Sequence, residues 1–237
     1  MFKSFAMLAC IALLAPLDLP RRSIGEGVEG GGLMFAHHSL FGDGRVDYVD
    51  YIFTRNGGCF DSGIAPSAST VIEAEIMIFS NQSHGLWTGL FGSRSLNGAR
   101  DALSCFRTPQ VNPNYIGWSI SGGYNDNAIS LSGKRDTWGT LSISLSGVSF
   151  MGVNSSTPST NWAESSLSLF ICGINENGHV LESHGTDMGL KWVRISDNGG
   201  IKGYFLPAVF DGAGCLYDKV AKRYVMPFQG SFTAVAT

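Results

Sequence analysis

The fold of this chain is decided near its C-terminus, where the sequence reads Gly-Tyr-Phe-Leu-Pro-Ala at 203–208, Gly-Cys-Leu-Tyr-Asp-Lys at 214–219 and Gly-Ser-Phe at 230–232. Each piece is apolar or aromatic, and each is bounded by glycine, proline or aspartate, which favour turns. The pattern predicts a strand that enters the core, a tight turn, a short Leu-Tyr-Asp strand, a hairpin and a last strand that ends near Ala234. We interpret this stretch as the last strands of a β-sandwich, which complete its sheets, and we call residues 203–232 the closing seam.

Upstream of the seam, short strands alternate with turn signals. In the clearest strand, the apolar residues at 72, 74, 76 and 78 lie on one face, and Glu73 and Glu75 lie on the other, which is typical of a half-buried strand. The run Asp-Asn-Gly-Gly at 197–200 predicts a hairpin turn. Because about a dozen such strands and no convincing helix can be traced, the sequence predicts an all-β fold, a two-sheet antiparallel jelly-roll sandwich.

The composition fits such a domain. Of 237 residues only 15% are charged and 31 are glycine, which is typical of turn-rich, often extracellular β-proteins. The formal net charge is −3, and no run of lysine and arginine residues is longer than a pair such as Arg21-Arg22. Nucleic-acid binding needs a basic face, so this composition argues against a nucleic-acid partner and against docking on anionic lipid.

The chain divides into three parts. Residues 1–22 form a hydrophobic N-terminal segment, residues 23–44 form a Gly-rich linker, and residues 45–237 form the β-domain. The first segment is either a secretion signal or a retained arm that anchors the domain to other subunits, and the sequence leaves both interpretations open. The adjacent His37 and His38 lack a third ligand, so we expect no metal site there.

The five cysteines lie far apart and form no Cys-x-x-Cys pair, which argues against zinc. If Cys10 is set aside, the remaining four allow two disulfides in an oxidising compartment. The alternative is that they are buried free thiols that pack as small hydrophobic groups.

A catalytic site is not predicted. A glycoside hydrolase needs two facing carboxyl groups, and although Glu73 and Glu75 share a face, no third carboxylate follows them in the spacing of laminarinase-like enzymes. A solvated strand face explains both glutamates. The chain also lacks the Gly-x-Ser-x-Gly elbow of serine hydrolases. We therefore expect a protein that is not an enzyme.

The best candidate for ligand binding combines aromatic rings with amide and carboxylate groups, which suit the apolar faces and hydroxyl groups of sugars. Its residues are Tyr115, Trp118, Tyr124, Asn125 and Asp126. The alternative is core and edge packing with turn chemistry. Asp126 with Asn127 offers oxygen ligands for calcium, and no other cofactor is expected. Trp138 and Trp192 are predicted to lie in the core.

Several motifs resemble a known family. They are Phe-Asp-Ser-Gly-Ile at 60–64, Ile-Glu-Ala-Glu-Ile at 72–76, Phe-Gly-Ser-Arg at 91–94 and the closing seam. Together they resemble the laminin-G-like, concanavalin A-like domains of bacterial surface proteins and phage virion proteins. The resemblance implies a curved jelly roll whose concave face or rim loops bind glycan, protein or calcium. It also implies that Cys59 lies near the last strands, where Cys215 replaces a usual glycine, and so suggests a Cys59–Cys215 disulfide.

These observations lead to three hypotheses for function. The first is a non-catalytic interaction module on an extracellular or virion surface, acting as a phage-like structural, decoration or adhesion protein. Its partners would be a glycan or surface protein, and other virion subunits or copies of itself, as a homo-oligomer, through the N-terminal arm. The second is an exported bacterial lectin that binds glycans, and the third is a glycoside hydrolase of the same fold.

Overall fold

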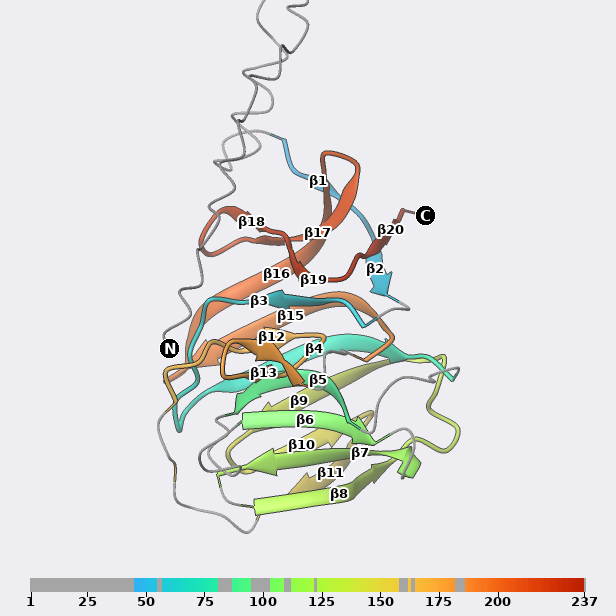
Figure 1. Ribbon diagram of the computed structural model, residues 1–237, viewed down its shortest axis with the longest axis vertical. Helices are drawn as coiled ribbons and strands as arrows, with labels where there is room; N and C mark the ends of the chain where they lie inside the picture. The colour runs from blue at the N-terminus through green and yellow to red at the C-terminus, as the bar shows by residue number, and fades with distance from the viewer. Residues whose placement is uncertain are drawn as a thin grey trace, which may run out of the picture.

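Two antiparallel β-sheets pack face to face to form a sandwich (Figure 1). The structure is a computed structural model, and it describes residues 45–54, 57–80, 87–94, 103–108, 112–121, 123–157, 162, 165–181 and 186–236. No α-helix occurs in these ranges. The predicted all-β sandwich is therefore confirmed, while the predicted N-terminal segment and Gly-rich linker lie outside the described residues.

Sheet A contains eleven strands among the described residues, and its main path runs β11-β10-β9-β4-β15-β16-β17-β18. Strand β1 pairs with β16, and β2 pairs with β15 and β20. The bounds are β1 Asp47–Tyr48, β2 Tyr51–Thr54, β4 Val71–Ile78, β9 Trp138–Ser144, β10 Gly147–Phe150, β11 Val153–Ser156, β15 Met188–Asp197, β16 Gly200–Phe210, β17 Ala213–Asp218, β18 Arg223–Val225 and β20 Thr233–Val235.

Sheet B contains nine strands in the described ranges, with the main path β19-β3-β12-β5-β6-β7-β8. Strand β13 pairs in parallel with β5 and antiparallel with β14. The bounds are β3 Cys59–Asp61, β5 Thr88–Arg94, β6 Leu103–Thr108, β7 Asn112–Ile120, β8 Gly123–Ser130, β12 Phe170–Ile171, β13 Asn175–Glu176, β14 His179–Val180 and β19 Pro227–Gln229. Strands β8 and β11 meet at the same end of the sandwich (Figure 1).

The core lies between the sheets because each strand alternates its side chains. Strand β4 shows the predicted pattern, with Ile72, Ala74, Ile76 and Ile78 at most 1% exposed and the residues between them half-buried. Sheet B supplies the opposing side of the same apolar cluster, including Leu90, Phe91, Trp118 and Ile129. Full burial of one such side chain stabilises the fold by about 1.5–3 kcal/mol, so the alternation fixes which face of each strand points inward.

The closing seam forms the predicted strands and joins the two sheets. Strands β16 and β17 pair across a turn, and β20 returns to pair with β2 near the start of the domain. Phe232, between β19 and β20, stacks on Phe60 of sheet B with ring centroids 4.2 Å apart. Gly214 permits this approach, because a Cβ atom there would lie 2.5 Å from the carbonyl oxygen of Phe232.

The predicted hairpin at 197–200 is also confirmed. Asp197 pairs with Gly200, and the two residues between them, Asn198 and Gly199, have φ values of 49° and 74°. Positive φ at both central positions is what a two-residue turn between twisted strands needs, and asparagine and glycine adopt it most readily.

The predicted Cys59–Cys215 disulfide is not present in the structure, where both cysteines are free and buried. Phe60 and Leu216 point into the core, so their neighbours Cys59 and Cys215 point to the outer faces of opposite sheets. Cys59 packs with Phe170 and Val180, whereas Cys215 packs with Ala208 and Tyr217. This placement matches the alternative of thiols that pack as small hydrophobic groups.

Candidate functional site

A row of outward-facing side chains crosses six neighbouring strands of sheet A, and we call it the sheet A row. Strand pairing places its members directly opposite one another, from β11 through β10, β9, β4 and β15 to β16. In that order the members are Asn154, Ser149, Ser142, Glu73, Arg194 and Tyr204. Because neighbouring strands lie about 4.8 Å apart, the row is about 24 Å long.

The direction of these side chains follows from their buried neighbours. Leu141 and Ile143 are in the core, so Ser142 between them faces solvent, and the same holds for Arg194 between Val193 and Ile195. At the edge strand, Ser155 turns inward and accepts a hydrogen bond from the Trp118 indole nitrogen at 2.9 Å. Its neighbours on β11 therefore face outward.

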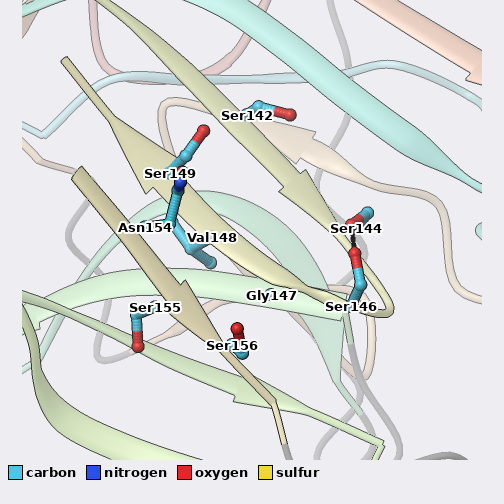
Figure 2. Close-up of a pocket in the computed structure, with 9 residues that line it drawn as sticks. All are labelled: Ser142, Ser144, Ser146, Gly147, Val148, Ser149, Asn154, Ser155 and Ser156. Atoms are coloured by element: carbon cyan, nitrogen blue, oxygen red, sulfur yellow. Dashed lines mark hydrogen bonds between the residues drawn. The ribbon is translucent and has the colours of Figure 1, made fainter. Parts of the chain in front are cut away.

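One end of the sheet A row is a groove lined by hydroxyl groups (Figure 2). Its volume is about 300 Å³, and six of its nine lining residues are serines of β9, β10 and β11 and their connecting turns. In Figure 2, Ser142, Ser149 and Asn154 lie side by side, while Ser144 and Ser146 bond to each other through their hydroxyl groups at 2.7 Å. None of the lining residues is ionisable.

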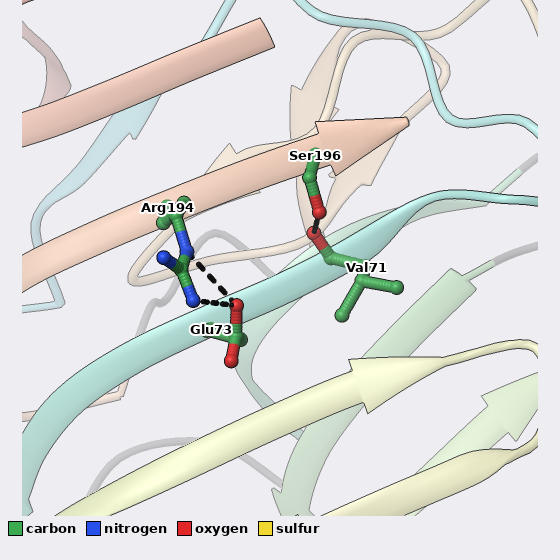
Figure 3. A network of polar contacts seen from close by, with 4 residues as sticks. All are labelled: Val71, Glu73, Arg194 and Ser196. Atoms are coloured by element: carbon green, nitrogen blue, oxygen red, sulfur yellow. Dashed lines mark hydrogen bonds and ion pairs between the residues drawn. The ribbon is translucent and has the colours of Figure 1, made fainter. Parts of the chain in front are cut away.

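The centre of the row is an ion pair between neighbouring strands (Figure 3). Nε and Nη2 of Arg194 donate to the same oxygen, Oε2 of Glu73, at 2.9 and 2.6 Å. The side chains are 43% and 31% exposed, so water screens the pair and it adds at most about 1 kcal/mol to stability. The pair instead holds the guanidinium group of Arg194 beside Glu73 on the outer face of the sheet, where its side chain is partly exposed to solvent.

The other end of the row is aromatic. Trp192, Arg194, Ile201 and Tyr204 line a second groove of about 370 Å³. The indole nitrogen of Trp192 donates to Oε2 of Glu75 at 3.1 Å, which fixes the ring. Walls of tryptophan and tyrosine beside a guanidinium group suit a ligand with apolar faces and hydroxyl groups.

Trp138 and Trp192 were predicted to lie in the core, and the structure shows that this is wrong, because both are only half-buried on the outer face of sheet A. For Trp192 the reason is a β-bulge between Leu190 and Trp192 in the pairing with β4. Trp138 faces outward by regular alternation, because it lies three residues before the inward-facing Leu141 on β9. Leu190 and Val193 both face inward, and the residue after the bulge is turned outward. Lys191 at the bulge lies 4.6 Å from the centroid of the Trp138 ring and donates to Glu75 at 2.7 Å.

The residues predicted to bind a ligand lie on sheet B and do not form one surface. Trp118 is 2% exposed and belongs to the core, so its expected place in the site is wrong. Tyr115 is half-buried on β7, and Oδ1 of Asn125 accepts a hydrogen bond from the backbone of Asn127 at 2.9 Å. Tyr124 is 52% exposed.

Tyr124 belongs to an aromatic cluster on the outer face of sheet B that the sequence did not predict. Its ring stacks on Phe106 at 5.8 Å and lies 5.8 Å from Trp87. Gly117 makes room, since a Cβ atom there would lie 2.5 Å from the Phe106 ring. Burial and then the charge of Asp126 raise the pKa of Tyr124. The cluster is a second, smaller candidate surface.

Comparison of the chain with known protein families and with curated proteins finds no match. In the ranges that the structure describes, no group of three or more histidine, cysteine, aspartate or glutamate residues could hold a metal ion, and no helix is long and apolar enough to cross a membrane. Calcium binding by Asp126 stays a prediction.

Proposed function

We propose that this protein is a non-catalytic binding module of an extracellular or virion surface, and that the sheet A row binds an extended glycan chain. The observation that carries the proposal is the continuity of the row. Hydroxyl groups, an ion-paired guanidinium group and an aromatic groove follow one another across six strands in register. A ligand that contacts all three needs many hydroxyl groups and apolar ring faces, and sugars have both.

The carboxylates on this face support binding over cleavage. Glu73 accepts two hydrogen bonds from Arg194, and Glu75 accepts from Lys191 and Trp192. A glycosidase needs one carboxyl group free to give a proton to the leaving oxygen. Here both carboxylates already bond to cationic groups, so we assign them to positioning Arg194 and Trp192.

The resemblance to laminin-G-like and concanavalin A-like domains adds support, since it implies a concave face or rim loops that bind glycan, protein or calcium. We propose that the chain belongs to this group of domains. The described fold agrees with it at the level of two packed antiparallel sheets.

The test is a glycan array followed by calorimetry with the best-binding oligosaccharide. Tyr204→Ala removes one wall of the aromatic groove, and we expect affinity to fall about tenfold, equivalent to about 1.4 kcal/mol. Tyr48→Ala is the matched control, because Tyr48 is a 47% exposed tyrosine of the same sheet outside the row. Failure of every glycan to bind, or equal losses in both variants, would contradict the proposal.

A second candidate function, a structural or decoration subunit of a phage-like particle, is favoured by the edge where both sheets end. Among the described residues, strand β18 ends the main path of sheet A and β19 ends that of sheet B, and only Met226 separates them in sequence. Met226 and Phe228 are 43% and 50% exposed there. Edge strands with exposed apolar groups favour association with another chain.

This candidate predicts a concentration-dependent oligomer. Mass photometry or sedimentation should detect it, and a Met226→Lys, Phe228→Lys double variant should be monomeric. A wild-type protein that stays monomeric at all concentrations would argue against it and leave glycan binding untouched.

A further inference from the structure

Arg107 is a buried cation near the C-terminal end of β6, and the proposed function does not use it. Cys105 points into the core and Phe106 points outward, so Arg107 points inward again, and it is only 1% exposed. Nη2 donates to the carbonyl oxygen of Pro113 at 2.7 Å. Nε and Nη1 are buried and have no hydrogen-bond partner in the part of the chain that the structure describes. Such donors normally find an acceptor in a native protein.

A second cation meets the same carbonyl oxygen. Arg135 also donates to the oxygen of Pro113, and to Oδ1 of Asn114 at 2.9 Å. Burial, followed by the nearby charge of Arg135, lowers the pKa of Arg107 to about 10, and the charge of Asp187 opposes this shift. Arg107 therefore stays protonated at neutral pH, and among the described residues the charges that act on it are the guanidinium group of the half-buried Arg135 and the carboxylate of the buried Asp187.

Hydroxyl groups complete the surroundings. Thr88 is the residue opposite Arg107 on β5, and it is 1% exposed. It accepts a hydrogen bond from the hydroxyl group of Thr186 at 3.1 Å, which leaves its own O–H group to donate. Asp187, beside Thr186, is 5% exposed and accepts from the backbone N–H of Gly57 at 3.2 Å.

We propose that the buried space beside Arg107 and Thr88 binds a small monovalent anion such as chloride, held by the unpartnered N–H groups of Arg107 and the hydroxyl group of Thr88. An anion accepts from both donors and also interacts favourably with the buried guanidinium charge of Arg107. A buried water molecule would satisfy the donors only. The occupant must be small, because neither unpartnered nitrogen is accessible from solvent. The site is separate from the sheet A row, so it goes beyond the proposed function.

The test compares thermal unfolding of the full chain in sodium chloride and in sodium gluconate at equal concentrations, since gluconate is too large to enter. We expect chloride to raise Tm along a saturable curve, by about 5–11 °C when its concentration is about 100 times Kd. Arg107→Met should abolish this rise. Arg223→Met is the matched control, because Arg223 is an exposed arginine, and it should keep the rise.

Equal Tm values in the two salts, a change that grows linearly without saturation, or a rise that persists in Arg107→Met would each overturn the proposal. If Arg107→Met does not fold, crystals of the unaltered protein in sodium bromide decide the question. An anomalous peak in contact with Arg107 supports the anion site, and electron density without anomalous signal identifies a water molecule and overturns it.

Discussion

The hydrogen bond between Trp118 and Ser155 fastens the edge strand β11 of sheet A to sheet B, and its removal is a sharp test of the sandwich. The indole nitrogen of Trp118 lies 2.9 Å from the Ser155 hydroxyl oxygen, and Trp118 is 2% exposed. In Ser155→Ala the indole N–H group loses its acceptor, which costs about 1–3 kcal/mol for a buried group. Ser155 is half-buried, so water partly replaces it and we expect about 1–2 kcal/mol.

Urea unfolding of Ser155→Ala, Trp118→Phe and the double variant measures this bond as a coupling energy. Trp118→Phe loses the bond and also leaves a cavity, so it should destabilise the protein more than Ser155→Ala. The two changes remove the same bond, and the double variant should therefore be less unstable than their sum by about 1 kcal/mol. The slope of unfolding against urea should stay the same. A coupling energy near zero would refute our reasoning that this bond joins the sheets.

Three further predictions concern the fold. Gly92→Ala should destabilise the protein by more than about 1 kcal/mol in urea unfolding, because φ is 138° and the new Cβ would lie 2.3 Å from a carbonyl oxygen of β6; unchanged stability would show that this strand can shift. Burial raises the pKa of both Cys59 and Cys215 to about 12, so iodoacetamide at pH 8 should label the two thiols only after unfolding. Because the folded pKa lies above the usual 9.0, the contribution of these thiols to stability should be full below pH 9 and lost as the pH rises towards 12. The Cys→Ala variants should not show this pH-dependent loss of stability. Glu73→Gln should change stability by at most about 1 kcal/mol, less at high salt, and a larger loss would mean that its ion pair with Arg194 is far less screened than its exposure implies.

The sequence could predict elements whose signal is local. The alternation at 72–78 and the turn at 197–200 depend only on neighbouring residues, so both appear in the structure at the expected places. The inward direction of the Trp118 side chain could also have been predicted from the sequence. Ile116, Trp118 and Ile120 alternate with Gly117 and Ser119, and this pattern alone indicates an inward-facing tryptophan.

The sheet A row could not be predicted, because it depends on how distant strands align. The local sequences around Ser142 and Arg194 give no sign of a binding site, and only the pairing register places these residues on either side of Glu73. The bulge beside Lys191 adds a further obstacle, since one extra residue reverses the inward and outward faces beyond it. The buried donors of Arg107 likewise depend on contacts with another strand.

A crystal structure of the protein with the oligosaccharide selected by the glycan array tests the central claim most directly. We predict that the sugar chain lies across the strands of sheet A, with one ring against Tyr204 and hydroxyl groups bonded to Arg194 and Ser142. A sugar bound elsewhere, for example on Tyr124 of sheet B, would contradict the claim that the sheet A row is the binding surface.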